Sequence, residues 1–382
     1  MAKSLKSFLA KKYPAAMDVD IITEVKYLDT GIPTMNYLIS GRPLTGGLPL
    51  TGKTTILYGP EGCGKTSFVA HMIAKAQQLG CEVVFLDTER SITKPRLHQF
   101  GVDIESMCYL TPDHMEECFD IIEEIAKERL DSDKDNPILI IWDSLAMTPT
   151  KEEIDRTSED KEVASQAKVL TRNLRRIRRL TQKINCSLLL INQARDNQDK
   201  YGDLFTMPGG HGLQHSADVI IRVNKVKPDE EGQGIKFSTP TKNRLFRPFQ
   251  NTVLRFEYVK GFTKENIADA FCDFLKQIEI LGSAGAYCYL ATDVQELMKK
   301  ENLPEKEAIK QVKKFYKKDF VDRLISDPEY YNKVVGDAEE YVNKHISLVS
   351  RIMFDPESDA KLVKKYDGEL ATSQSDIEEE EE

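Results

Sequence analysis

From Val25 to Phe262, short apolar runs alternate with longer amphipathic stretches. The apolar runs predict buried strands at Thr55–Tyr58, Val83–Asp87, Met107–Leu110, Pro137–Trp142, Ser187–Asn192 and Val219–Val226. The amphipathic stretches predict helices at Ser67–Gln78, His114–Leu130 and Val163–Ile184. Because continuous apolar strands separated by helices are typical of a parallel sheet covered on both faces, we expect an α/β fold with a mostly parallel sheet between helices. Two further runs, Gly234–Ser238 and Thr252–Tyr258, predict antiparallel strands at one edge.

The pattern changes after Phe262, where charged, amphipathic stretches replace the alternation. We expect a helix at Asn266–Ile280, a break at Gly282–Gly285, a strand at Tyr287–Leu290 and then helix to Met353, interrupted at Pro304 and Pro328. Residues 26–262 therefore predict the core, and residues 263–370 predict a small, α-rich C-terminal domain. Residues 371–382 have almost no apolar side chains and predict a disordered acidic tail.

Residues 1–25 contain a short amphipathic segment. Leu5, Phe8, Leu9 and Tyr13 recur at helical spacing among lysines, and Pro14 ends the pattern. Thirteen residues are too few for a stable isolated helix, so this segment needs a surface to dock on. The pattern does not decide between the core of the same chain and a neighbouring molecule.

The composition limits the class of protein. With 40% hydrophobic and 30% charged residues among 382, we expect a soluble globular protein of roughly two to three domains. No apolar run approaches the ~20 residues of a membrane span, and the N-terminus lacks an apolar signal segment, so we expect no membrane partner. The seven cysteines include no C-x-x-C pair, which favours reduced thiols in the cytoplasm. Of the net charge of −9, Asp376 and Glu378–Glu382 supply six negatives, so a site for a polyanion requires a local basic patch.

One stretch fits the phosphate-binding pattern G-x-x-x-x-G-K-[ST] between a predicted strand and a predicted helix. Its residues are Gly59, Pro60, Glu61, Gly62, Cys63, Gly64, Lys65 and Thr66, and Ser67 begins the helix. The glycines let backbone N–H groups curve around a phosphate chain, and the helix N-terminus adds partial positive charge. Lys65 can reach the β- and γ-phosphates, and the Thr66 hydroxyl can bind Mg²⁺. We therefore expect this loop to bind a nucleoside triphosphate with Mg²⁺.

The same pattern occurs twelve residues earlier, at Gly47–Thr54. No apolar strand leads into it, and the element that follows it is a strand. Without a helix N-terminus, no helix dipole is available to hold a phosphate. We interpret this stretch as a glycine and proline turn before the first core strand, and we expect Lys53 to have no part in nucleotide binding.

Two strand ends carry carboxylates that suit the chemistry of a bound triphosphate. Asp143 follows the apolar run Pro137–Trp142 and would support Mg²⁺ through its water shell, with a turn cap as the alternative. Asp87 and Glu89 lie at the end of Val83–Asp87, a strand that we expect next to the phosphate-loop strand. Either carboxylate could polarise the water that attacks the γ-phosphate, or Asp87 could cap a helix, and the pattern alone leaves these possibilities open.

A basic helix and a polar loop follow. The sides of Val163–Ile184 away from its apolar face carry seven basic residues, namely Lys168, Arg172, Arg175, Arg176, Arg178, Arg179 and Lys183. Such a face is often only solvated, but with no acidic residue between Lys168 and Lys183 it also suits phosphates. Asp196–His211 is a long polar loop that holds Tyr201 and Phe205 and ends in glycines. It suits single-stranded nucleic acid, which would stack on the aromatic rings and accept N–H···phosphate bonds.

These motifs occur in an order and at spacings that resemble one family. The series comprises the phosphate loop GPEGCGKT, FLDTE followed by Gly101-Val102-Asp103, then WDS, INQAR at Ile191–Arg195, and Gly209-Gly210 before a helix. It resembles the bacterial RecA and phage UvsX strand-exchange recombinases over about Tyr27–Phe262. The stretches Asp29–Asn36, Thr45-Gly46-Gly47 and Ser216-Ala217-Asp218 are closer to the phage UvsX-like branch. The resemblance implies a RecA-like P-loop ATPase core with a short N-terminal polymerisation arm and a small C-terminal domain.

The resemblance also implies roles for individual residues. Glu89 matches the glutamate that activates the hydrolytic water, and Gln193 matches the glutamine that senses the γ-phosphate and couples it to the following DNA loop. Lys242 and Arg244 match a Lys-x-Lys pair that reaches the ATP of the adjacent subunit, although arginine alters the geometry. The positions that match DNA-contacting residues are Lys168, Arg175, Arg195, Gly209 and Gly210.

Three positions depart from the family pattern. Arg96 stands where an aromatic residue usually stacks on adenine, and a guanidinium can also stack there. His215 replaces an interface phenylalanine. Asp155–Glu162, the first DNA loop by position, is unusually acidic.

Taken together, the resemblance implies a DNA-dependent ATPase with ATP and Mg²⁺ as cofactors. It would form a helical filament on single-stranded DNA, pair it with homologous double-stranded DNA and exchange strands, in DNA recombination, DNA repair and phage replication. The N-terminal segment would dock on the next subunit, and the acidic tail would compete with DNA or recruit partners, such as single-strand-binding and mediator or loader proteins in the bacterial or phage-infected host cytoplasm. The rivals are a ring-forming hexameric helicase motor and a non-catalytic mediator paralogue. Nothing in the chain resembles a primase-interacting domain, and the intact Glu89, Gln193 and Lys242/Arg244 pair argue against the paralogue.

Overall fold

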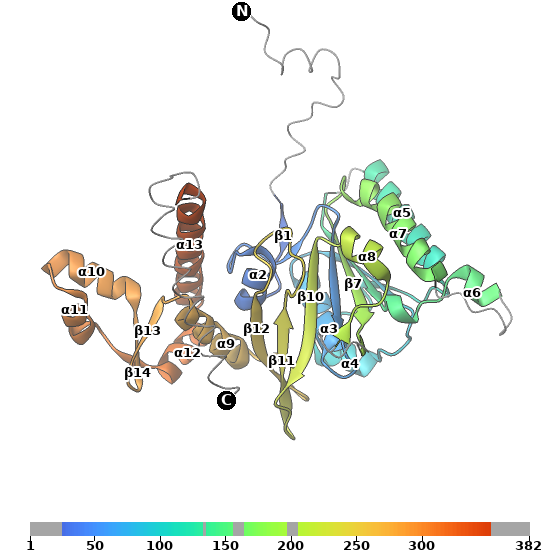
Figure 1. The fold of residues 1–382 in the computed structure, drawn as a ribbon. Coiled ribbons are helices and arrows are strands. Elements are labelled where there is room, and N and C mark those ends of the chain that lie inside the picture. The colour runs from blue at the N-terminus through green and yellow to red at the C-terminus, as the bar shows by residue number, and fades with distance from the viewer. Residues whose placement is uncertain (1–24, 133–134, 156–163, 197–204, 353–382) are drawn as a thin grey trace, which may run out of the picture.

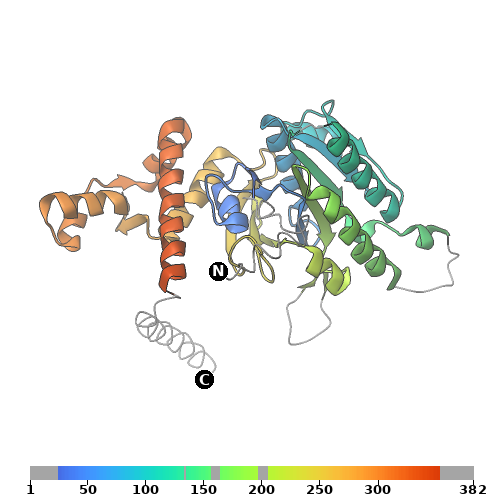
Figure 2. The ribbon, with the colours of Figure 1, turned by 90° about the horizontal axis from the view of Figure 1, so that it is seen from above.

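An eight-stranded sheet forms the core, at the right of Figure 1, with helices against both of its faces (Figures 1 and 2). The structure, a computed structural model, describes residues 25–132, 135–155, 164–196 and 205–352. The strands are arranged in the order β12-β11-β10-β3-β7-β6-β4-β5. In chain order they are β3 (Lys53–Gly59), β4 (Glu82–Asp87), β5 (Met107–Leu110), β6 (Ile138–Asp143), β7 (Cys186–Gln193), β10 (Val219–Val226), β11 (Gly232–Ser238) and β12 (Asn251–Glu257).

The six strands from β10 to β5 pair in parallel, and β11 and β12 add antiparallel strands beside β10. This arrangement confirms the expected α/β fold with a mostly parallel sheet and an antiparallel edge. All eight predicted strands of the core form, each within two residues of its expected bounds.

The expected neighbour of the phosphate-loop strand was wrong. We expected β4 to lie beside β3, but β7 and β6 lie between them. Every residue of β6 is buried, and so are all residues of β7 except Gln193, whereas β5 at the end of the sheet is half exposed. The strands that are apolar on both sides therefore occupy the centre of the sheet, where both faces are covered.

Two apolar clusters lie on the two faces of the sheet. The first includes Phe68 of helix α3 (Lys65–Gln78), and the second includes Phe119 of α5 (Met115–Ser132). Adjacent residues of β6 divide between them, since Ile141 belongs to the first cluster and Trp142 to the second. The remaining helices of this half are α2 (Pro33–Ser40), α4 (Lys94–Gln99), α6 (Lys151–Asp155), α7 (Ala164–Thr181) and α8 (Gly210–Ser216), with a short pair of strands β1 (Tyr27–Leu28) and β2 (Leu48–Pro49).

The C-terminal part is built around its own apolar cluster. Its elements are α9 (Lys264–Gln277), β13 (Leu281–Ala284), β14 (Tyr287–Leu290), α10 (Ala291–Glu301), α11 (Glu305–Gln311), β15 (Phe315–Tyr316), α12 (Lys317–Ser326) and α13 (Pro328–Ile352). Phe271, Phe320 and Val335 lie in the centre of that cluster. The predicted break in the helix is confirmed, because α9 ends at Gln277, but the pattern missed that Leu281–Ala284 pairs with β14 as a strand. The prediction of helix after β14, interrupted at Pro304 and Pro328, missed β15, which pairs with β14 through two residues.

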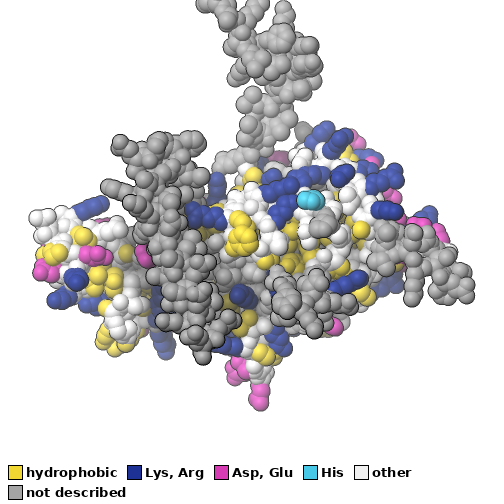
Figure 3. Space-filling view, viewed as in Figure 1, with side chains coloured by type: hydrophobic (Ala, Val, Ile, Leu, Met, Phe, Trp, Pro, Cys, Tyr) yellow, Lys and Arg dark blue, Asp and Glu magenta, His cyan; other side chains and the backbone are white. Residues whose placement is uncertain are grey.

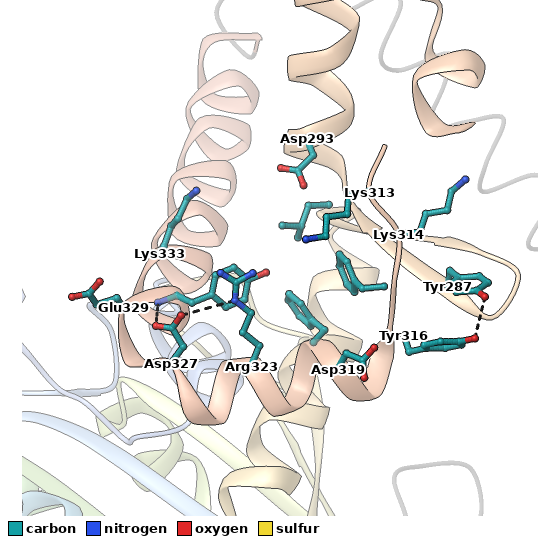
Figure 4. Close-up of a pocket in the computed structure, with 14 residues that line it drawn as sticks. Tyr287, Asp293, Lys313, Lys314, Tyr316, Asp319, Arg323, Asp327, Glu329 and Lys333 are labelled. Carbon is teal, nitrogen blue, oxygen red and sulfur yellow. Dashed lines mark hydrogen bonds and ion pairs between the residues drawn. The ribbon is translucent and has the colours of Figure 1, made fainter. Parts of the chain in front are cut away.

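A cavity of about 970 Å³ opens in this C-terminal part between β14, β15 and the two following helices (Figure 4). Tyr287 and Tyr316 lie on one side of it with their hydroxyls 3.0 Å apart. Arg323 lies 3.7 Å above the ring of Tyr330. The charges that line the cavity have both signs: Asp293, Asp319, Asp327 and Glu329 face Lys313, Lys314, Arg323 and Lys333. This cavity is larger than the pocket of about 570 Å³ beside the loop Gly59–Thr66, but it lacks the excess positive charge that a triphosphate requires.

A carboxylate from the last described helix fastens the C-terminal part to the core. Glu339 on α13 accepts hydrogen bonds from the backbone N–H groups of Leu44 and Thr45, at 2.7 and 2.9 Å, and from the Thr45 hydroxyl at 2.6 Å. Nearby, the ring of Tyr37 on α2 packs 4.6 Å from that of Phe274 on α9. We name the three hydrogen bonds from Leu44 and Thr45 to Glu339 the Glu339 clamp.

Several predicted segments lie outside the described residues. They are the amphipathic segment near the N-terminus, most of Asp155–Glu162, the middle of Asp196–His211 and the acidic tail. Among the helices that the structure describes, none combines the length and apolar character that crossing a membrane requires.

Candidate functional site

A pocket of about 570 Å³ lies where the loop Gly59–Thr66 passes from β3 into α3. The predicted site residues that line it are Glu61, Gly62, Gly64, Lys65, Thr66, Ser67, Glu89, Arg96, Asp143 and Gln193. Gly59, Pro60 and Cys63 complete the loop but do not line the pocket. Four separate segments of the sequence, at residues 61–67, 89–96, 143 and 193, are thus brought together near the C-terminal ends of parallel strands, where ligands bind in open α/β sheets.

The loop has the backbone that a phosphate cradle requires. Gly64 is the N-cap of α3, with a φ of 101°, and Gly62 has a φ of 67°. A Cβ at Gly64 would lie 2.3 Å from the flexible end of Ile235, and the φ of 101° disfavours any residue with a side chain, so glycine suits this position. The Lys65 ammonium donates to the carbonyls of Gly59 and Pro60, at 2.9 and 2.8 Å, which holds it along the loop. The first N–H groups of α3 have no partner within the helix and can bind an anion.

The earlier Gly47–Thr54 stretch also has glycines with positive φ, but no helix begins there. It contains β2 and a turn, and Lys53 begins β3. The backbone N–H of Gly52 donates to the Cys186 carbonyl at 2.7 Å, and that of Thr54 donates to the Asp218 carboxylate at 3.1 Å. Because these donors are used inside the fold, the interpretation as a turn before the first core strand is confirmed.

Glu89, Asp143 and Gln193 lie together at one end of the pocket. The Gln193 side-chain amide donates to Glu89 Oε1 at 2.9 Å, and the Ser144 hydroxyl donates to the same oxygen. Asp143 is buried, and burial, followed by the nearby charges of Glu89 and Asp87, raises its pKa to about 7. Lys65 partly offsets this increase in the pKa. The carboxylates of Asp143, Glu89 and Asp87 therefore outnumber the single nearby cation among the described residues, Lys65, and this excess of negative charge suits a bound cation.

Asp87 and Glu89, which the sequence pattern could not separate, have different surroundings. Asp87 is 1% exposed, and its carboxylate accepts hydrogen bonds from the Arg90 N–H at 2.7 Å and the Tyr109 hydroxyl at 2.8 Å. Burial and then the bond to Asp87 raise the pKa of Tyr109 to about 12. Asp87 thus caps a turn beside the pocket, whereas Glu89 lines it.

Arg96 lies at the other end of the pocket. Its Nη2 donates to Ser67 Oγ at 2.9 Å, and its guanidinium lies 5.2 Å from the ring centre of Phe100 and 5.8 Å from that of Phe256. Burial lowers the pKa of Arg96. Sequence reasoning missed the rest of this wall, which consists of Lys225, Gln233, Phe256 and Tyr258. Lys225, Gln233 and Phe256 come from β10, β11 and β12, and Tyr258 directly follows β12, so they lie far along the chain and no local motif marks them.

Lys242 and Arg244 do not reach the pocket of their own chain. The Lys242 ammonium donates to the carbonyls of Gln214 and His215, at 2.6 and 2.8 Å. Arg244 donates to the His215 carbonyl at 3.2 Å and to Asp218 Oδ1 at 3.4 Å. Both cations therefore lie at the C-terminal end of α8. Figure 3 shows dark blue side chains gathered over this region, where Figure 1 places α8 and the upper end of β10.

The candidate DNA-contacting residues lie around α7 and α8. Lys168 and Arg175 are exposed on α7, and Gly209 and Gly210 begin α8 with φ values of 106° and 69°. The exposed Arg195 is the first residue of a two-residue strand, β8 (Arg195–Asp196), which pairs with β9 (Phe205–Thr206) as the stem of a hairpin.

Part of the basic face of α7 is occupied within the fold. Arg176 forms ion pairs with Asp120 and Glu123 of α5, at 2.8 and 3.0 Å. Arg178 forms an ion pair with Asp218 at 2.9 Å. The sequence showed no acid within this stretch of α7, but tertiary packing supplies acids from elsewhere. The expectation of seven positive charges facing phosphates is therefore corrected to a smaller set.

Comparisons with known proteins agree with this geometry. Residues 17–263 match the family model of the RecA N-terminal domain. The chain is 29% identical to protein RecA of Sulfurimonas denitrificans over 248 residues, which cover 63% of this chain and 69% of that protein. It is 31% identical to protein RecA of Ruminococcus albus over 239 residues, covering 61% and 58%, and 30% identical to protein RecA of Aquifex aeolicus over 256 residues, covering 66% and 70%. The chain belongs to the RecA family.

Proposed function

We propose that this protein is an ATP-dependent recombinase that forms a helical filament on single-stranded DNA, pairs it with homologous duplex and exchanges strands. The observation that carries the proposal is the hydrogen bond from Gln193 to Glu89. Gln193 ends β7 inside the nucleotide pocket, and Arg195, two residues later, begins the β8–β9 hairpin. A γ-phosphate that draws Gln193 away from Glu89 therefore pulls on the base of that hairpin, which links the nucleotide to the DNA-contacting segment.

The residues of the pocket divide the work of hydrolysis. Lys65 and the N–H groups of the loop bind the phosphates of ATP, and Glu89 accepts a proton from the attacking water. The hydroxyl of Thr66 and the carboxylate of Asp143 are the hard oxygen donors that Mg²⁺ prefers, so these two residues would hold the ion. When bound, Mg²⁺ neutralises and orients the phosphates. The buried Asp143 beside Glu89 fits this role, because a cation removes the repulsion between the two carboxylates.

Lys242 and Arg244 complete the site of a neighbouring subunit in this proposal, because they lie away from the pocket of their own chain. Each ATP is then held between two subunits, and binding of ATP and assembly on DNA support each other. Lys168, Arg175, Arg195, Gly209 and Gly210 contact the DNA. Within the family we place the chain in the phage UvsX-like branch, on the motifs at Asp29–Asn36 and Ser216-Ala217-Asp218.

The remaining parts of the chain assist assembly in this proposal. Residues 1–25 dock on the next subunit, residues 26–262 form the ATPase core, and residues 263–370 form a C-terminal domain, followed by the acidic tail. Single-strand-binding and mediator or loader proteins assist in the cytoplasm of a bacterium or a phage-infected host.

Electron microscopy with single-stranded DNA and a slowly hydrolysed ATP analogue tests the assembly. We expect helical filaments, whereas closed rings would indicate a helicase motor and discrete oligomers a mediator. The coupling is tested with Gln193→Ala, which should retain ATP binding but lose the stimulation of ATP hydrolysis by DNA. Asp87→Asn is the matched control for a buried polar change near the pocket that leaves the Gln193–Glu89 bond intact. Full stimulation by DNA in Gln193→Ala would refute the coupling.

A further inference from the structure

Asp218 lies at a junction between three segments that serve the proposed function. It is 1% exposed and immediately precedes β10. Its Oδ2 accepts the N–H of Thr54, near the start of the strand that leads to the phosphate loop, at 3.1 Å. Its Oδ1 accepts hydrogen bonds from Arg178 of α7 at 2.9 Å and from Arg244 at 3.4 Å.

The backbone fastens Arg244 to the same place. The N–H of Arg244 donates to the Asp218 carbonyl at 2.9 Å, and the N–H of Ile220 donates to the Lys242 carbonyl at 3.0 Å. Val219 and Asn243 form an antiparallel bridge between these two bonds. Both the main chain and the side chain of Arg244 are therefore positioned relative to Asp218.

The shape of the guanidinium explains why an arginine suits this position. Of its five N–H groups, one donates to Asp218 and one to the His215 carbonyl, and 47% of the side chain remains exposed. The fork can thus keep its hold on Asp218 and still present N–H groups outward. An ammonium group has only three donors, all on one nitrogen, so a lysine bonded to Asp218 would present fewer donors outward than the arginine fork does.

We propose that Asp218 is a positioning residue that directs the Arg244 guanidinium toward the triphosphate bound by the neighbouring subunit. This inference rests on the proposed function, in which ATP lies between subunits. Arg178 shares the carboxylate, and Lys242 and His215 are the other titratable groups close to it. The competing explanation is that Asp218 acts only within its own subunit, through Thr54 and the strand that leads to the phosphate loop.

Mixed filaments separate these two explanations. Asp218→Asn should lower kcat/KM of single-stranded-DNA-dependent ATP hydrolysis about tenfold, the scale of one lost charge-assisted hydrogen bond. Lys65→Ala subunits have a defective phosphate loop but an intact Asp218 and Arg244. Mixing the two variants should give more activity than the sum of the separate proteins, because the Lys65→Ala subunit supplies a well-directed Arg244 to its neighbour. No gain on mixing, together with weaker binding of a fluorescent ATP analogue to Asp218→Asn without DNA, would overturn the proposal.

A parallel mixture distinguishes the failure of this inference from the failure of the proposed function. Arg244→Ala mixed with Lys65→Ala should also gain activity if ATP sites are shared between subunits. If this mixture shows no gain although filaments form, the shared site itself is refuted. If it gains activity and the Asp218→Asn mixture does not, only the role of Asp218 is refuted.

A second variant covers the case in which Asp218→Asn does not fold, which thermal unfolding would reveal. Arg244→Lys retains the charge and leaves Asp218, Thr54 and Arg178 in place. It should also lose about tenfold in kcat/KM with single-stranded DNA, because the lysine is drawn to Asp218. When both variants fold, the double variant Asp218→Asn/Arg244→Lys should have a kcat/KM no lower than that of Arg244→Lys alone, because Asp218 acts through residue 244. Full activity of Arg244→Lys, or additive losses in the double variant, would contradict the proposal.

Discussion

Gly47–Thr54 and Gly59–Thr66 share one pattern of glycine, lysine and threonine, twelve residues apart, but the structure uses them differently. In the first, the backbone N–H groups of Gly52 and Thr54 donate to Cys186 and Asp218 inside the fold. In the second, Gly64 caps α3, and Lys65 lies along the loop at the mouth of a pocket. What separates them is the element that follows, a strand in one case and a helix in the other.

The comparison shows that the motif alone does not make a phosphate site. The glycines permit the curved backbone in both loops, since Gly52 and Gly62 have similar φ values of 64° and 67°. Only a helix start leaves several N–H groups without partners, all directed to one point. Substitutions in the two loops should therefore have different consequences, which can be measured in pairs.

The largest contrast concerns the two lysines. Lys65→Ala should lower kcat/KM of ATP hydrolysis by about 10²–10³-fold, the scale of removing one preorganised donor from an active site. Lys53→Ala should change it less than about twofold, as for an ordinary substitution away from a site. Steady-state hydrolysis with saturating single-stranded DNA measures both, and thermal unfolding verifies that both variants fold. A loss of ATP binding in Lys53→Ala alone would reverse the assignment of the two loops.

The next contrast concerns glycines that face crowded surroundings. A Cβ at Gly52 would lie 2.2 Å from the backbone carbon of Thr181, so Gly52→Ala should reduce the free energy of unfolding by about 3 kcal/mol. At Gly64 the obstructing atom is the flexible end of Ile235, so Gly64→Ala should lose less stability but much more nucleotide affinity. Urea unfolding and titration with a fluorescent ATP analogue separate the two effects. Equal stability losses in the two variants would show that Thr181 can move away as readily as Ile235.

The smallest effect is expected at Gly62, which has open space around its missing side chain. Its φ of 67° still disfavours other residues, so Gly62→Ala should reduce the free energy of unfolding by about 1 kcal/mol. Because the backbone N–H groups remain, ATP affinity should fall less than in Gly64→Ala. A stability loss as large as that of Gly52→Ala would mean that the loop is more crowded than the structure indicates.

The two loops could be distinguished from sequence because the deciding feature is local. Strand, loop and helix follow each other within residues 54–80, and the strands of the core were found by the same kind of local pattern. The order of strands in the sheet could not be found this way. It depends on which strands are buried on both faces, and the assumption that β4 lies beside β3 was therefore wrong.

The candidate site shows the same limit. Asp87 and Glu89 are two residues apart, but Asp87 accepts a hydrogen bond from Tyr109 on the neighbouring β5, whereas Glu89 accepts one from Gln193 at the end of β7. Gln233 and Tyr258 line the pocket from the antiparallel edge, and Arg178 is paired by an aspartate forty residues away. In each case the contact depends on tertiary structure, so no spacing in the sequence encodes it.

The Glu339 clamp has a mechanical consequence. Because a single carboxylate accepts three hydrogen bonds from Leu44 and Thr45, a force applied to α13 reaches the segment after α2 directly, without travelling around the almost 300 intervening residues. The clamp adds to the packing of α9 against α2 and β12, so the C-terminal part is joined to the core at two places that are far apart in the sequence.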